Sequence, residues 1–141
     1  MVAPVNVRLP APVAESLEAF GRRAGWRKSQ VINTALKEWL QLEGHPRIRF
    51  VEPIPGERRA ALVDGPEVWT VAEVWLQLDP AGRDVAAAGE ATGLRADQVE
   101  AALAYWADNR EEIDGLVRRI QAAQEQAHAA WARRRELDTL P

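Results

Sequence analysis

The sequence predicts a mainly α-helical protein with two units. Three observations lead to this prediction. A short alternating segment at residues 5–9 is followed at once by two helical patterns, a second group of helical patterns begins at Val68, and a long final pattern runs from Glu111 to about Leu137. The length of 141 residues suffices for one ordinary domain or two small ones.

The N-terminal segment alternates between apolar and polar residues, which is the pattern of a strand with one buried face. Val5, Val7 and Leu9 share one face, and Asn6 and Arg8 share the other. An outward Asn suits adenine and an outward Arg suits guanine in the DNA major groove.

A first helix is expected from about Pro10 or Pro12 to Ala24, because proline is favoured in a first helical turn. Gly25 is a natural stop. Its apolar positions form one stripe: Val13, Leu17, Phe20 and Ala24.

A second helix is expected from about Lys28 to Glu43, ended by Gly44, His45 and Pro46. Its apolar stripe is two residues wide, which is broad for a helix with one small partner helix. The stripe consists of Val31, Ile32, Ala35, Leu36, Trp39 and Leu40.

These patterns divide the chain into residues 1–46, an ordered connector at 47–67 with two short extended pieces, and a helical region at 68–141. In the third part, helices are expected at 68–78, 84–91, 95–108 and 111–137.

The net charge of −3 is unevenly distributed. Residues 1–46 carry six basic and four acidic side chains, whereas residues 68–108 carry two basic and seven acidic ones. The basic excess therefore accompanies the strand motif, and the acidic excess indicates a second module with a different partner.

Several function classes lack support in the composition. The chain has no cysteine, and its two histidines, His45 and His128, lie far apart in sequence. We therefore expect no metal site and no histidine-based catalysis, although carboxylates alone could still bind a hard cation. The sequence has no nucleophile–base pair, no glycine-rich phosphate loop and no metal signature, so we expect no cofactor and no enzymatic activity. There is no apolar run of membrane-spanning length and no signal-peptide pattern, so we expect a cytoplasmic protein without a membrane partner.

The N-terminal residues resemble the ribbon-helix-helix family, which includes Arc and the CopG-type regulators. Residues 5–10, Val-Asn-Val-Arg-Leu-Pro, are similar to the strand of Arc, and residues 25–32 resemble the segment between the two helices. The resemblance covers about residues 4–44. It implies a homodimer in which two strands pair antiparallel, four helices share one core, and the ribbon enters the major groove.

By this resemblance, Asn6 and Arg8 would face base edges of double-stranded operator DNA. Backbone N–H groups around Lys28 and Ser29 would bind a phosphate at the start of the second helix. Two positions depart from the family: Pro4 replaces a third outward polar residue, and Arg27 stands where a capping Ser, Thr or Asn is usual, although it can contact phosphate directly.

Residues 84–108 have the spacing of a helix-turn-helix, but the charge argues against a second DNA reader. Arg95 is the one base in residues 95–108, against Asp97, Glu100 and Asp108, so a packing role is favoured.

The C-terminal half is similar to the DUF433-like C-terminal domain of toxin–antitoxin antitoxins. The match spans about residues 58–115 and includes Arg58 to Leu62, Gly65 to Trp69, Gln98 to Trp106 and Glu111 to Asp114. The resemblance implies a PIN-type ribonuclease toxin as partner.

The final helix fits that role, since about 40 Å of helix has more surface than a small domain can cover. Trp131 stands alone among alanines and is a plausible interface anchor. The alternative is that it folds back onto its own domain or stays partly exposed. The expected toxin-binding residues are Ile113, Leu116, Val117, Ile120 and Trp131.

The sequence thus predicts an N-terminal ribbon-helix-helix intertwined dimer plus a C-terminal helical domain with a helix-turn-helix-like segment and a long final helix. The expected function is that of a type II antitoxin, which autorepresses its operator and neutralises a PIN-type ribonuclease. The alternative is a ribbon-helix-helix transcriptional regulator whose C-terminal domain oligomerises or senses a ligand. A scaffold without a DNA function is a further alternative.

Overall fold

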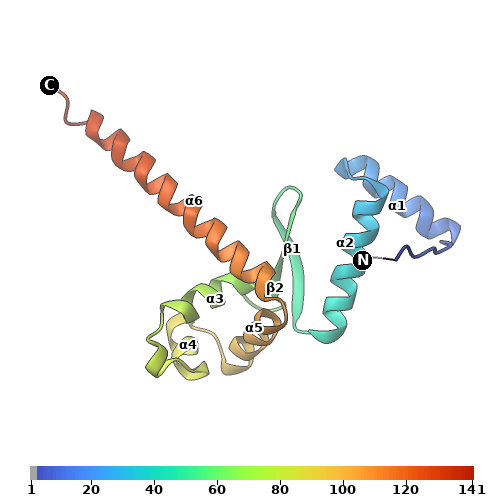
Figure 1. Ribbon diagram of the computed structural model, residues 1–141, viewed down its shortest axis with the longest axis horizontal. Helices are drawn as coiled ribbons and strands as arrows, with labels where there is room; N and C mark the ends of the chain where they lie inside the picture. Colours follow the sequence, from blue (N-terminus) through green and yellow to red (C-terminus); the bar gives the residue numbers. More distant parts are fainter. Residues whose placement is uncertain (1–2) are drawn as a thin grey trace. The chain divides into compact units, whose positions relative to one another are not determined.

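The computed structural model describes residues 3–141, which form a mainly helical protein with one two-stranded antiparallel sheet (Figure 1). The mainly helical fold class is therefore confirmed. The chain divides into two compact units, unit 1 up to Gly44 and unit 2 from His45 to Pro141.

Unit 1 consists of helices α1 (Ala11–Ala24) and α2 (Lys28–Gly44). α1 has a proline in its first turn and ends at Gly25, whose φ of 70° is left-handed and therefore suits glycine. The chain then turns tightly, because the N–H of Trp26 donates to the carbonyl oxygen of Gly21 at 2.9 Å. A Cβ at Gly21 would lie 3.0 Å from the carbonyl oxygen of Trp26, so this close approach favours glycine.

Unit 1 has no interior of its own. Neither α1 nor α2 contains a buried residue. Large apolar side chains are exposed along both helices: Val13 50%, Phe20 39%, Leu36 55%, Trp39 59% and Leu40 61%. Two helices of this length cannot enclose the wide apolar stripe of α2.

The expected strand over Val5 to Leu9 is absent from the single chain, where residues 3–10 have no regular secondary structure. The physical reason is that a strand exists through its ladder of hydrogen bonds, and these residues have no neighbouring strand to pair with. Val5 and Val7 are 84% and 72% exposed.

Unit 2 begins with a hairpin of β1 (Ile48–Ile54) and β2 (Glu57–Leu62). The strands pair antiparallel from Ile48 opposite Leu62 to Ile54 opposite Glu57, and Gly56 supplies the positive φ of the turn. Both extended pieces expected in residues 47–67 are thus strands, and they belong to unit 2.

Four helices and a short 3₁₀ helix complete unit 2: α3 (Val68–Gln77), η1 (Pro80–Gly82), α4 (Val85–Thr92), α5 (Ala96–Asp108) and α6 (Arg110–Leu137). Local sequence explains their ends, since the Asp84 carboxylate accepts from the N–H of Ala87 at 2.7 Å and Gly93 ends α4 with a left-handed φ of 75°. The hairpin, α3, α5 and the beginning of α6 surround the core, whose largest fully buried side chains are Tyr105, Leu62, Ile113, Val68, Val71 and Val99.

α6 has two halves with different surroundings. Its first turns are buried against the rest of unit 2, whereas every residue from 122 to 141 is exposed. The second half extends beyond the other elements of unit 2, none of which lies beside it (Figure 1).

Candidate nucleic-acid interface and partner-binding helix

The start of α2 presents unpaired backbone donors. The N–H of Val31 donates to the carbonyl oxygen of Arg27 at 3.1 Å, so Arg27 is the residue that precedes the helix. The Arg27 side chain has no acceptor and cannot cap the N–H groups that follow it. These N–H groups, near Lys28 and Ser29, have the positive end of the helix dipole behind them and can bind an anion.

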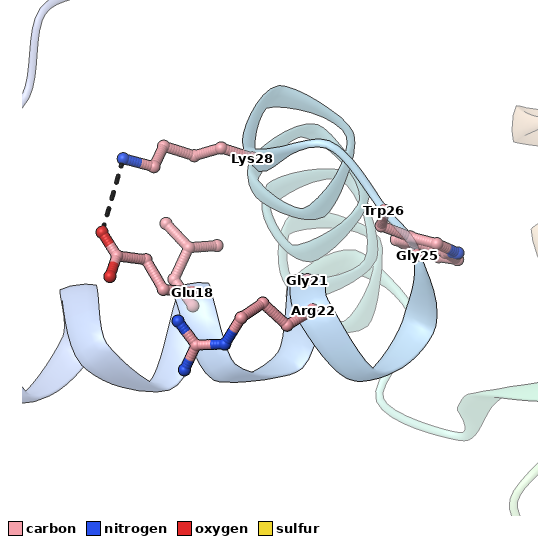
Figure 2. A pocket seen from close by; sticks show the side chains of 7 residues that line it. Glu18, Gly21, Arg22, Gly25, Trp26 and Lys28 are labelled. Atoms are coloured by element: carbon pink, nitrogen blue, oxygen red, sulfur yellow. Dashed lines mark ion pairs between the residues drawn. The ribbon is translucent and has the colours of Figure 1, made fainter.

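A cavity of about 390 Å³ lies beside this helix start, between α1 and α2. Figure 2 shows the side chains of Lys28, Glu18 and Arg22 pointing to the same side, with the Trp26 ring pointing away from them; all four residues line the cavity. The Lys28 ammonium and the Glu18 carboxylate are 3.9 Å apart, and their side chains are 65% and 54% exposed. Such an exposed pair contributes little to stability, so a phosphate can compete for Lys28.

Arg22 is a second cation at this cavity that sequence reasoning did not select. It lies in the last turn of α1, six residues before Lys28 in the chain. Only the tight turn at Gly25 brings the two side chains to one cavity, which the residue pattern does not reveal. The one sequence feature that could have pointed to Arg22 is that the last turn of α1 is basic.

Asn6 and Arg8 lie in the segment without regular structure and are exposed. Both are free of the burial that would prevent contact with DNA bases. Asn6, Arg8, Arg27, Lys28 and Ser29 are all exposed residues of unit 1.

The start of α5 is held by an ion cluster of unit 2. The Arg95 guanidinium donates to Asp64 Oδ2 at 2.7 Å and to Asp97 Oδ1 at 3.1 Å. The hydrogen bond from Arg95 is the main reason why the pKa of the Asp64 carboxyl and that of the Asp97 carboxyl lie below their ordinary values. The single base at this helix is thus engaged by two carboxylates, which fits a packing role for residues 84–108.

Side-chain hydrogen bonds fix α6 against α5. The Tyr105 hydroxyl donates to Glu112 Oε2 at 2.6 Å, and Trp106 Nε1 donates to Asp114 Oδ1 at 2.7 Å. Burial acts to raise the pKa of the Asp114 carboxyl, but hydrogen bonds from Trp106 and Arg110 outweigh it and lower the pKa. These contacts determine the direction in which α6 leaves unit 2.

Three of the five expected toxin-binding residues are core residues of unit 2. Ile113, Leu116 and Val117 are 1%, 5% and 4% exposed. In the single chain, α3 and α5 cover the face of α6 to which these three residues belong, so their contact with a partner stays a prediction. Ile120 is half-buried, and Trp131 is 50% exposed.

Trp131 is the centre of a small group on the exposed half of α6. The His128 ring stacks on it with a centroid separation of 5.8 Å, and the Arg135 guanidinium lies over it at 5.1 Å. Trp131 does not fold back onto its own unit and is 50% exposed, which agrees with the partly exposed alternative as well as with an interface anchor.

The described residues show neither a metal centre nor a membrane segment. Nowhere in residues 3–141 do three or more His, Cys, Asp or Glu side chains gather as a metal site. No helix within that range combines the length and the apolar character needed to cross a membrane.

The chain was compared with protein-family models, with curated proteins and with solved structures, and none of them matches it.

Proposed function

We propose that this protein is a dimeric antitoxin that binds its own operator through unit 1, represses transcription, and neutralises a PIN-type ribonuclease through unit 2. The observation that carries the proposal is that unit 1 has no buried residue in either helix, although it exposes a broad apolar face.

An exposed face of this size requires a partner. Leu36, Trp39 and Leu40 are each more than half exposed and lie within two turns of α2. Patches of this kind on small proteins mark interaction surfaces. A second copy is the simplest partner, because the segment from Val5 to Leu9 also needs a strand to pair with, and an identical strand satisfies both needs at once.

DNA fits the polar side of the same unit. A paired ribbon would carry Asn6 and Arg8 from each chain on one face, and the donors at the start of α2 can bind phosphates beside it. The basic excess of residues 1–46 supports this assignment, whereas the seven acidic residues at 68–108 argue against DNA binding by unit 2.

The nuclease is assigned to unit 2 because α6 extends beyond its own core. Trp131 is a half-exposed aromatic residue on this extended helix, and aromatic residues are enriched among interface anchors. A transcriptional regulator without a toxin remains the second candidate, and the exposed half of α6 would then serve oligomerisation.

The proposal is tested by selecting duplexes from a random DNA pool with the full-length protein. The affinity of the selected duplex is then measured by fluorescence anisotropy over a salt series. We expect two chains, or a multiple of two, for each site and a selected duplex that binds on the order of 10³-fold or more tightly than a scrambled one. Equal affinity for both duplexes would overturn the DNA assignment.

Co-expression with the product of the adjacent reading frame tests the toxin assignment. We expect a stable complex and loss of ribonuclease activity. If the protein binds the selected duplex specifically but forms no complex with the nuclease, the plain transcriptional regulator would be favoured.

A further inference from the structure

The exposed half of α6 continues a heptad pattern that starts in the core of unit 2. From Ile113 onward, the positions spaced alternately by three and four residues are the a and d positions of a heptad repeat. The first three are Ile113, Leu116 and Ile120, of which two are buried and the third is half-buried. The next five are exposed: Ala123, Ala127, Ala130, Arg134 and Leu137.

This spacing fits a helix as the partner, and alanine also occurs away from it, at the c positions Ala122 and Ala129 and the f position Ala132. It extends over about three and a half heptads, and a repeat of 3.5 residues indicates a helix that packs along another helix. A helix that merely lies on a globular surface has a broader apolar face with a period of 3.6 residues. We call the five exposed positions, Ala123, Ala127, Ala130, Arg134 and Leu137, the α6 seam.

We propose that the α6 seam pairs with the α6 seam of a second copy of this chain, as a parallel two-helix coiled coil in register. The inference rests on the proposed function only for the presence of two chains, since unit 1 would hold two copies of α6 in one molecule. Such a linkage raises the effective concentration of the second helix to the millimolar range.

Charge complementarity selects the second copy and the parallel direction. In a parallel pair, a g residue faces the e residue that lies five positions later on the other helix. Arg133 occupies g, and Asp138, which follows the last residue of α6 with helical backbone angles, occupies e, so each Arg133 would meet the Asp138 of the other chain. Arg134 is the one polar seam residue, and a single polar a position typically fixes register and a two-stranded state.

The seam leaves the Trp131 group accessible. Trp131 is an e residue at the edge of the seam, and His128 and Arg135 are b residues on the outer side. A pair of α6 helices could therefore still present Trp131, with its stacked His128 and overlying Arg135, to the proposed nuclease.

Single cysteines test this pairing directly, because the chain has no native cysteine. Ala123→Cys and Ala130→Cys place a thiol at two d positions, and Ala132→Cys places one at an outward f position as the matched control. All three replace an exposed alanine in the same helix, so folding is not at risk. Each full-length variant is oxidised mildly at low micromolar concentration and analysed by non-reducing electrophoresis.

We expect both seam variants to give on the order of tenfold more disulfide-linked dimer than the control, because only thiols that face each other across the pair can meet. An antiparallel pair would bring at most one of the two d positions opposite itself, so crosslinking of a single seam variant would overturn the proposal. Equal crosslinking in all three variants, or none, would overturn it as well.

The measured mass separates this inference from the proposed dimer. A dimeric full-length protein without seam crosslinks would contradict the α6 pairing alone, whereas a monomer at the same concentration would contradict both. Charge reversal adds an independent arm: Arg133→Glu should weaken crosslinking of Ala130→Cys, and the added change Asp138→Arg should restore it.

Discussion

Replacing Leu40 by Ala is the most direct test of the dimer, because its effect can be worked from the exposed fraction of the side chain. Leu→Ala removes about 2.4 kcal/mol of apolar transfer free energy, taken as roughly three methylene equivalents at about 0.8 kcal/mol each. Leu40 is 61% exposed in the single chain. If dimerisation buries this exposed fraction of Leu40, the Leu40→Ala change removes about 1.5 kcal/mol of dimerisation free energy for each copy and about 3 kcal/mol for the dimer.

The expected result is a dimer dissociation constant about a hundredfold higher, since each 1.4 kcal/mol corresponds to about tenfold. Alanine is at least as good a helix former as leucine, so α2 itself should not weaken. Sedimentation equilibrium of the full-length protein over a range of concentrations measures the constant.

Leu76→Ala is the matched control, because Leu76 is also a half-exposed leucine, at 49%, but belongs to α3 of unit 2. It should leave the dissociation constant unchanged. A change below about threefold for Leu40→Ala, or equal effects of both variants, would refute the assignment of the dimer interface to unit 1.

Three further predictions concern DNA, the partner and pH. Arg8→Ala should cost about 1–3 kcal/mol for each affected base contact on the selected duplex, whereas Lys28→Ala should weaken binding to all duplexes and reduce the salt slope by about one; anisotropy distinguishes them. Trp131→Ala should cost about 2 kcal/mol or more in affinity for the nuclease by calorimetry, with an unchanged melting temperature. The pKa values of Asp64 and Asp97 are lowered in the folded state, so their stabilisation is present above the unfolded pKa of about 3.9 and is lost as pH falls through the folded value. Urea unfolding between pH 6 and 3 should therefore show a smaller loss of stability for Asp97→Asn than for the unchanged protein.

The helices could be predicted because their signals are local. Prolines before α1, Gly25 after it and Asp84 before α4 act on backbone groups within one turn, so the predicted bounds agree with the structure to within about two residues. The two extended pieces around Gly56 could also be predicted, but less accurately: pieces expected at about 48–51 and 60–63 are strands at Ile48–Ile54 and Glu57–Leu62.

The N-terminal strand illustrates the limit of such reasoning. Alternation at Val5 to Leu9 identifies an apolar face, but it does not say which strand completes the ladder. In one chain nothing pairs with it, and the segment is irregular.

The burial of three of the expected toxin-binding residues could not be predicted for a related reason. The spacing of Ile113, Leu116 and Val117 correctly places them on one apolar face of α6. Spacing cannot tell whether a partner or the chain's own core covers that face. The cavity that joins Arg22 to Lys28 escaped prediction because it depends on the path of a turn rather than on spacing.

The absence of a core in unit 1 has a consequence for regulation under the proposed function. If the ribbon forms only when two chains meet, the DNA-reading face does not exist in the monomer, and folding, dimerisation and DNA binding are linked by mass action. Occupancy of the operator would then rise with the square of the chain concentration while monomers predominate. Autorepression would switch over a narrower range of concentration than a preformed monomeric reader allows. Pairing along the α6 seam would shift that range to lower concentration, because a second contact between the same two chains strengthens the dimer without touching the DNA.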